Sequence, residues 1–72
     1  MAQHLIKYLD DPIAAEPKEI GFESMPSYQV AMDRVAEVMP ELRAKHGPKT
    51  GYRIEDMTGR IVMIGPGRGS DA

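Results

Sequence analysis

The sequence predicts a small α+β domain of β-α-β-β order, with a three-stranded sheet and one kinked amphipathic helix packed on one face. Three patterns indicate this fold: an apolar strand-like segment near the start, a helical stripe in the middle, and two alternating segments joined by a tight turn. A chain of 72 residues is one domain at most. We expect the domain to span residues 1–64, followed by a flexible glycine-rich tail over residues 65–72.

The first strand is expected over residues 3–9, because apolar and β-forming side chains are dense there. Alternation gives it one face with His4, Ile6 and Tyr8 and another with Leu5, Lys7 and Leu9. Residues 10–23 contain two prolines and several acidic side chains without a sustained period. We therefore expect a long loop there, with at most a short extended piece around Glu19 to Glu23.

The helix should begin near Ser24, a good N-cap, with Pro26 in the first turn. Its apolar side chains recur at spacings of three and four, which places them on one stripe: Tyr28, Ala31, Met32, Val35, Val38, Met39 and Leu42. Pro40 predicts a kink, or a second short helix that starts there. The Gly47-Pro48 pair is a strong stop signal.

A β-hairpin is predicted around the turn of residues 56–59, where Asp56 can accept a backbone hydrogen bond and Gly59 suits a bulge. Counting outward from this turn predicts four cross-strand pairs: Glu55 with Ile61, Ile54 with Val62, Arg53 with Met63, and Tyr52 with Ile64. The face that packs on the helix should then carry Tyr52, Ile54, Val62 and Ile64. An ion pair between Asp56 and Arg60 is expected at its rim.

The other face of the sheet is expected to need a cover, since one helix can protect only one side. The loop of residues 10–23 or a second copy of the chain would supply it. The predicted interaction surface consists of Leu5, Leu9, Arg53, Ile61 and Met63.

Charge is unevenly distributed along the chain. Residues 1–42 hold three basic against eight acidic side chains, a net charge of −5, and residues 43–72 hold six against three, a net charge of +3. The basic end predicts an alternative site for an anion or nucleic acid, formed by Lys45, Lys49, Arg53, Arg60 and Arg68. The glycine-rich segment of residues 65–69 does not favour a phosphate loop, because only three residues follow it and no helix can form there.

Several classes of chemistry find little support. The chain has no cysteine, and neither His4 nor His46 has a matching ligand at helical spacing, so we expect no metal and no cofactor. We predict that the protein is not an enzyme, and no small-molecule substrate is indicated. The sequence has neither a signal peptide nor a membrane-spanning run, so we expect a cytoplasmic protein that does not bind membranes.

The segments "AMDRVAEVM" and "YRIEDMTGRIVMI" resemble short, uncharacterised bacterial domains, mostly proteobacterial, of the same β-α-β-β order. The resemblance implies the fold and no activity. The leading functional hypothesis is a small non-catalytic protein interaction module that binds a protein partner or forms a homodimer through a sheet face or edge. A regulatory subunit of a larger enzyme would have the same sequence features.

Overall fold

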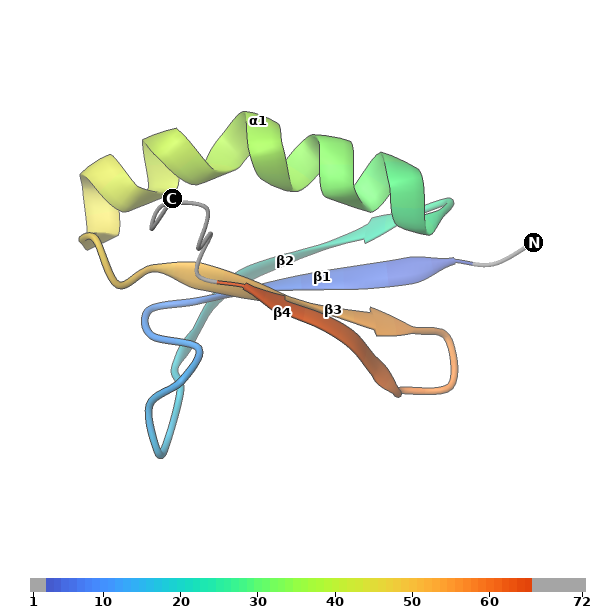
Figure 1. The fold of residues 1–72 in the computed structure, drawn as a ribbon, viewed down its shortest axis with the longest axis horizontal. Coiled ribbons are helices and arrows are strands. Elements are labelled where there is room, and N and C mark those ends of the chain that lie inside the picture. The colour runs from blue at the N-terminus through green and yellow to red at the C-terminus, as the bar shows by residue number, and fades with distance from the viewer. Residues whose placement is uncertain (1–2, 66–72) are drawn as a thin grey trace.

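The computed structural model describes residues 3–65 and has two layers (Figure 1). The strands are β1 (His4–Leu9), β2 (Glu19–Met25), β3 (Gly51–Asp56) and β4 (Ile61–Gly65), and the helix is α1 (Tyr28–His46). The strands form one antiparallel sheet in the order β2-β1-β3-β4, and α1 lies across one face of it. The α+β class is confirmed, but the sheet has four strands and the predicted three is wrong.

The additional strand is β2. It contains the short extended piece expected around Glu19 to Glu23 and continues to Met25, where the helix was expected to begin. It pairs with β1 along its length, from His4 opposite Met25 to Leu9 opposite Glu19, with an irregularity between Tyr8 and Leu9. Glycine and glutamate have low strand propensity, which hides this strand in the sequence. An edge strand tolerates such residues because one of its sides remains in contact with water, and charged side chains there discourage pairing with other chains.

The core lies between α1 and the two central strands. Ile6 pairs with Ile54 and Tyr8 with Tyr52, so these four side chains share the helix-facing side of the sheet. The predicted stripe of α1 supplies the other layer. The buried cluster consists of Ile6, Tyr8, Ala31, Val35, Met39, Tyr52 and Ile54, with Ile20, Met25, Met32, Val38, Leu42 and Met63 partly buried around it.

Helix α1 begins one turn later than expected. Its N-cap is Ser27, whose Oγ accepts a hydrogen bond from the Val30 N–H at 3.2 Å, while Ser24 belongs to β2. Ser24 and Ser27 are both suitable N-cap residues, because a serine hydroxyl can accept a hydrogen bond from a free N–H three residues later. Since Ser24 is paired with β1 as part of β2, the helix begins after Ser27. α1 continues through Pro40 without dividing into two helices, and Gly47 ends it with a positive φ of 114°.

The turn between β3 and β4 is confirmed. Asp56 Oδ1 accepts hydrogen bonds from the N–H of Thr58 at 2.9 Å and of Arg60 at 3.0 Å, and Gly59 has a positive φ of 90°. The predicted ion pair with Arg60 is thus replaced by a hydrogen bond from the Arg60 backbone. These hydrogen bonds hold the pKa of Asp56 below its ordinary value, with the Thr58 side chain as the largest cause.

The register of β4 differs from the prediction. Glu55 pairs with Ile61 as expected, but Ile54 pairs with Met63, Arg53 with Ile64 and Tyr52 with Gly65. One extra residue, Val62, is accommodated between the first two pairs. Because side chains alternate, this bulge reverses the later part of β4: Met63 faces α1, whereas Val62 and Ile64 are exposed.

Gly65 is the last residue of β4 and is buried, so it belongs to the domain and not to a tail. The remainder of the predicted flexible tail, residues 66–72, lies outside the described residues. No helix within residues 3–65 is long and apolar enough to cross a membrane.

Candidate functional site

The face of the sheet opposite α1 is the first candidate surface, and we call it the open face. The strand register places two rows on it. One row runs across the sheet through Phe22, Lys7, Arg53 and Ile64, and the next through Ser24, Leu5, Glu55 and Ile61. Among residues 3–65 α1 is the one helix, and it covers the other side (Figure 1).

An ion cluster occupies the centre of the open face. Glu55 Oε2 lies 3.5 Å from Lys7 Nζ and 2.9 Å from Arg53 Nε. The Glu55 side chain is only 12% exposed, so the two cations shield it from water. The Arg53 Nε–H is buried and aligned for no hydrogen bond within the described part of the chain, so its contact with Glu55 is an ion pair by distance alone. Two cations around one carboxylate leave this centre with one net positive charge.

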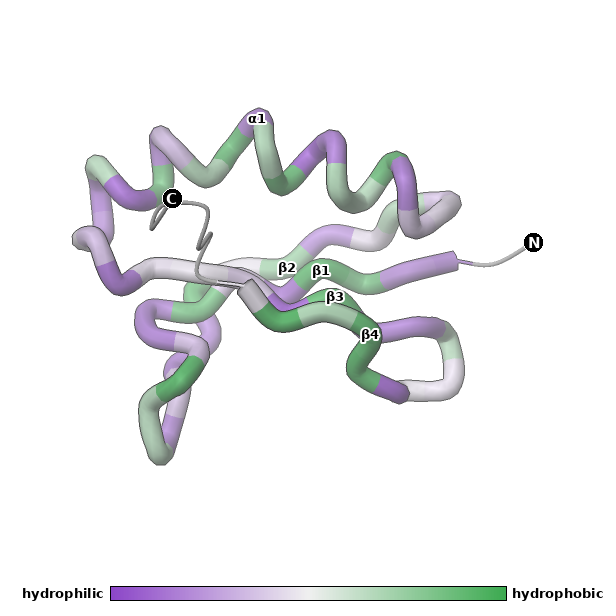
Figure 2. The backbone as a smooth tube through the Cα atoms, in the orientation of Figure 1, coloured by the Kyte–Doolittle hydropathy of each residue, from purple (hydrophilic) through white to green (hydrophobic). Residues whose placement is uncertain are grey.

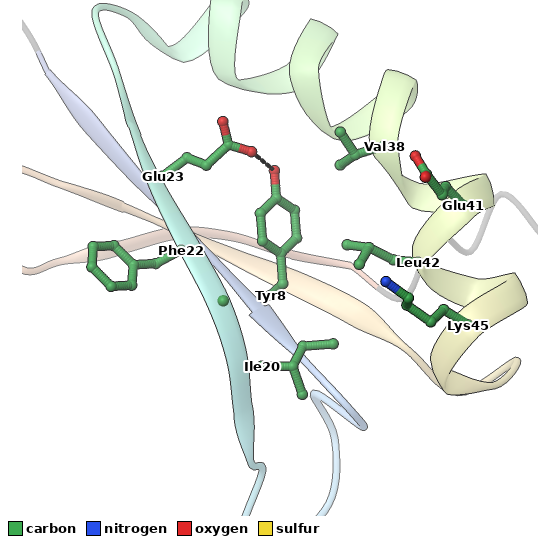
Figure 3. Close-up of a pocket in the computed structure, with 9 residues that line it drawn as sticks. Tyr8, Ile20, Phe22, Glu23, Val38, Glu41, Leu42 and Lys45 are labelled. Atoms are coloured by element: carbon green, nitrogen blue, oxygen red, sulfur yellow. Dashed lines mark hydrogen bonds between the residues drawn. The ribbon is translucent and has the colours of Figure 1, made fainter.

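Exposed apolar side chains border this cluster on both outer strands. Phe22 on β2 is 65% exposed, and on β4 Ile61 is 46% and Ile64 47% exposed. Phe22 points away from α1 (Figure 3), and the hydropathy colouring shows apolar residues along β4 (Figure 2). Single exposed apolar residues are ordinary, but several on one sheet face make that face a candidate interaction surface.

The loop of residues 10–18 covers one end of the open face. It projects on the side of the sheet away from α1 (Figure 1) and is closed by a hydrogen bond from the Asp10 N–H to the Lys18 carbonyl at 3.0 Å. Leu9 and Pro12 are buried, whereas Ile13 is 79% exposed. The loop therefore protects the end around Leu9 and leaves the rest of the face uncovered.

The structure brings most of the predicted interaction surface together. Leu5, Arg53 and Ile61 share the open face, and Leu9 lies on it but is buried. Met63 was placed there wrongly, because the bulge turns it towards α1. Sequence reasoning missed Phe22 and Ile64. In a strand, Phe22 points to the opposite side of the sheet from its neighbours Gly21 and Glu23. This placement on the open face can be predicted only once β2 is known to be a strand.

The predicted anion-binding residues are not brought together. Lys45 is on α1 and Lys49 precedes β3, whereas Arg60 follows the opposite end of β3. A strand of six residues separates these ends by roughly 20 Å. Arg53 is engaged with Glu55, and Arg68 lies outside the described residues.

A second candidate surface is a cavity of about 340 Å³ between β2 and the C-terminal half of α1, which we call the β2–α1 groove (Figure 3). Apolar side chains of Ile20, Val38 and Leu42 line it, together with the charged groups of Glu23, Glu41 and Lys45. Tyr8, Gly21 and Phe22 complete the lining.

A hydrogen-bond network links the sheet to α1 at this groove. Tyr8 Oη donates to Glu23 Oε2 at 3.0 Å, and Arg34 Nε donates to both oxygens of Glu23 at 3.1 Å. Arg34 also donates to Glu37 at 3.1 Å. Burial raises the pKa of Tyr8 well above its ordinary value, and the hydrogen bond to Glu23 adds to this. The phenol therefore stays protonated and acts as a fixed donor.

The two histidines lie in different elements, His4 in β1 and His46 in α1. His4 packs edge-on against Tyr28 with ring centroids 5.8 Å apart, and His46 is the last residue of α1. The residues that the structure describes contain no group of three or more His, Cys, Asp or Glu side chains that could hold a metal ion.

Comparisons with protein-family models, with curated proteins and with solved structures find no match to this chain.

Proposed function

We propose that the protein is a small, non-catalytic interaction module that forms a homodimer through the open face. The observation that carries this proposal is the pair of apolar borders formed by Phe22 on β2 and by Ile61 and Ile64 on β4, with no element of the described chain packed over them. Burial of such side chains is favourable by about 25 cal/mol per Å² of apolar surface.

A second copy suits this face in size. A standard interface takes roughly 800 Å² from each partner, which is about a sixth of the 4668 Å² surface of this molecule. One side of a two-layer protein can supply that area. With a two-fold axis parallel to the strands, β2 of one copy lies over β4 of the other, so that Phe22 meets Ile61 and Ile64 from the partner copy.

The ion cluster sets the strength of this dimer. Its three charges already pair within one copy, so burying them costs less than burying isolated charges. The remaining positive charge on each copy nevertheless opposes the approach of a second one. We therefore expect dissociation in the micromolar range, and tighter association at higher salt, which screens the repulsion.

Analytical ultracentrifugation from low micromolar to near-millimolar concentration tests this proposal. Ile64→Asp should abolish the dimer, because it places a carboxylate at the apolar border. Val30→Asp is the matched control, since Val30 is 40% exposed on α1 and lies outside the open face. A monomer at all concentrations, or equal effects of the two variants, would contradict the proposal.

The alternative of an anion or nucleic-acid binder has less support, because its cations lie at opposite ends of β3 and Arg53 is already paired with Glu55.

A further inference from the structure

We infer that the β2–α1 groove binds an extended basic peptide segment of another protein, which adds a strand to the free edge of β2. This surface shares only Phe22 with the open face and takes a different partner, so the inference goes beyond the proposed homodimer. Three features of the groove support it: an unpaired strand edge, an adjoining apolar cavity, and an excess of carboxylates.

The strand edge provides the backbone hydrogen bonds. β2 is an end strand of the described sheet and pairs with β1 alone. Every second N–H and C=O group of β2 therefore points outward, ready to pair with an added strand. The regular stretch is Gly21–Met25, because the irregularity between Tyr8 and Leu9 disturbs the pairing at the other end.

The cavity provides specificity for a side chain. Its volume of about 340 Å³ is at the lower end of the roughly 300–1,000 Å³ found for small-molecule sites, which suits one or two side chains of a peptide. Ile20 on β2 and Val38 and Leu42 on α1 form its apolar part (Figure 3). Side chains of an added strand alternate, so every second residue of the peptide would point into the groove.

The charge of the groove favours a basic partner. Among its lining residues Glu23 and Glu41 are acidic and Lys45 is basic. Glu23 is held by Arg34, whereas Glu41 is exposed on the α1 side of the groove. β2 itself carries Glu19 and Glu23 and no basic residue. A lysine or arginine at one of the groove-facing positions of the peptide, next to an apolar residue at another such position, would be attracted to this rim.

Fluorescence anisotropy tests the inference with a labelled, end-capped hexapeptide in which valine and lysine take turns at every second position and threonine fills the positions between, so that both kinds of side chain share the groove-facing side. The full chain should bind it with micromolar affinity, and Glu41→Lys should weaken binding roughly 3- to 10-fold. Asp33→Lys is the matched control, because it makes the same charge change on an exposed position of α1 outside the groove. Absence of binding, or equal weakening by both variants, would overturn the inference.

Amide hydrogen exchange locates the bound peptide. Exchange should slow in Gly21–Met25 when the peptide is added, and slowing in β4 instead would overturn the inference. Ile64→Asp, which tests the homodimer, should bind the peptide like the unaltered chain. Loss of the dimer with peptide binding retained would refute only the proposed function, and a dimer that binds no peptide would refute only the groove.

Discussion

The ring of Tyr52 lies over Gly65 on the neighbouring strand, and the two residues form a cross-strand pair. A Cβ atom added to Gly65 would lie 2.6 Å from Tyr52 Oη and 2.7 Å from Tyr52 Cζ. Real Cβ atoms do not approach other atoms so closely, so the packing of this buried tyrosine requires a residue without a side chain at position 65. The Tyr52 ring thus packs directly against the backbone of Gly65 at the end of β4.

Gly65→Ala should therefore destabilise the protein, by roughly 1–3 kcal/mol, because the Tyr52 ring must leave its position in the core. Gly21→Ala is the matched control: Gly21 pairs with Tyr8, but an added Cβ there would make an ordinary contact of 3.8 Å with Tyr8 Cδ2. Urea denaturation should show the first variant clearly weakened and the second within about 0.5 kcal/mol of the parent. Equal effects would contradict the close packing of Tyr52.

Met63→Asp and Ile64→Asp test the bulge in β4. Met63 packs against the core, whereas Ile64 is 47% exposed. An unpaired carboxylate at the first position should cost several kcal/mol or prevent folding, and at the second less than about 1 kcal/mol. Circular dichroism with urea denaturation measures both. The opposite order would mean that β4 follows the simple alternation, with Val62 and Ile64 inward.

Tyr8 should make the stability depend on alkaline pH. Its pKa is raised in the folded protein above the ordinary value of 10.0. Below about pH 10 both states keep the proton and the stabilisation is fully present, whereas above it the unfolded phenol ionises first. The free energy of unfolding should then fall by up to about 1.4 kcal/mol per pH unit.

Tyr8→Phe isolates this effect. It should cost about 1 kcal/mol at neutral pH through loss of the hydrogen bond to Glu23, and the difference from the parent should shrink as the pH rises from about 9 to 11. Urea denaturation at each pH gives this difference. A constant difference would contradict the assigned pKa shift.

Pro40→Ala should stabilise the protein. Pro40 is exposed within α1 and has no N–H for the carbonyl four residues earlier. Alanine restores that hydrogen bond and has the best helix propensity, so a gain of roughly 1–3 kcal/mol is expected. Thermal unfolding measures it, with Glu41→Ala as a control at the adjacent exposed position. A loss of stability would show that the proline ring contributes packing at this turn.

Thr50→Val should also be neutral or stabilising. Thr50 is fully buried directly before β3, and its Oγ1 has no hydrogen-bond partner within residues 3–65. Its carbonyl accepts from Arg43 Nε at 3.2 Å, and this contact does not need the hydroxyl. Replacing an unpaired buried hydroxyl by a methyl group should gain up to about 1 kcal/mol. A clear loss in urea denaturation would indicate a partner for the hydroxyl.

The features that depend on neighbours in the chain could be predicted from the amino-acid sequence. The stripe of α1 from Ala31 to Leu42 follows from helical spacing, the turn at Asp56 and Gly59 from their own backbone preferences, and the faces of β1 from alternation. For the open face, Leu5, Arg53 and Ile61 could be placed in advance, because they lie on central strands or beside the turn.

The features that depend on pairing between distant segments became known from the three-dimensional fold. β2 is a strand because β1 offers its backbone groups, and this also moves the helix N-cap from Ser24 to Ser27. The bulge at Val62 reverses every later side chain in β4, because it adds one residue to the strand. Ile64 therefore lies on the open face in the place predicted for Met63. The open face depends on both pairings and the β2–α1 groove on the pairing of β2 with β1, so neither surface could be drawn completely from local patterns.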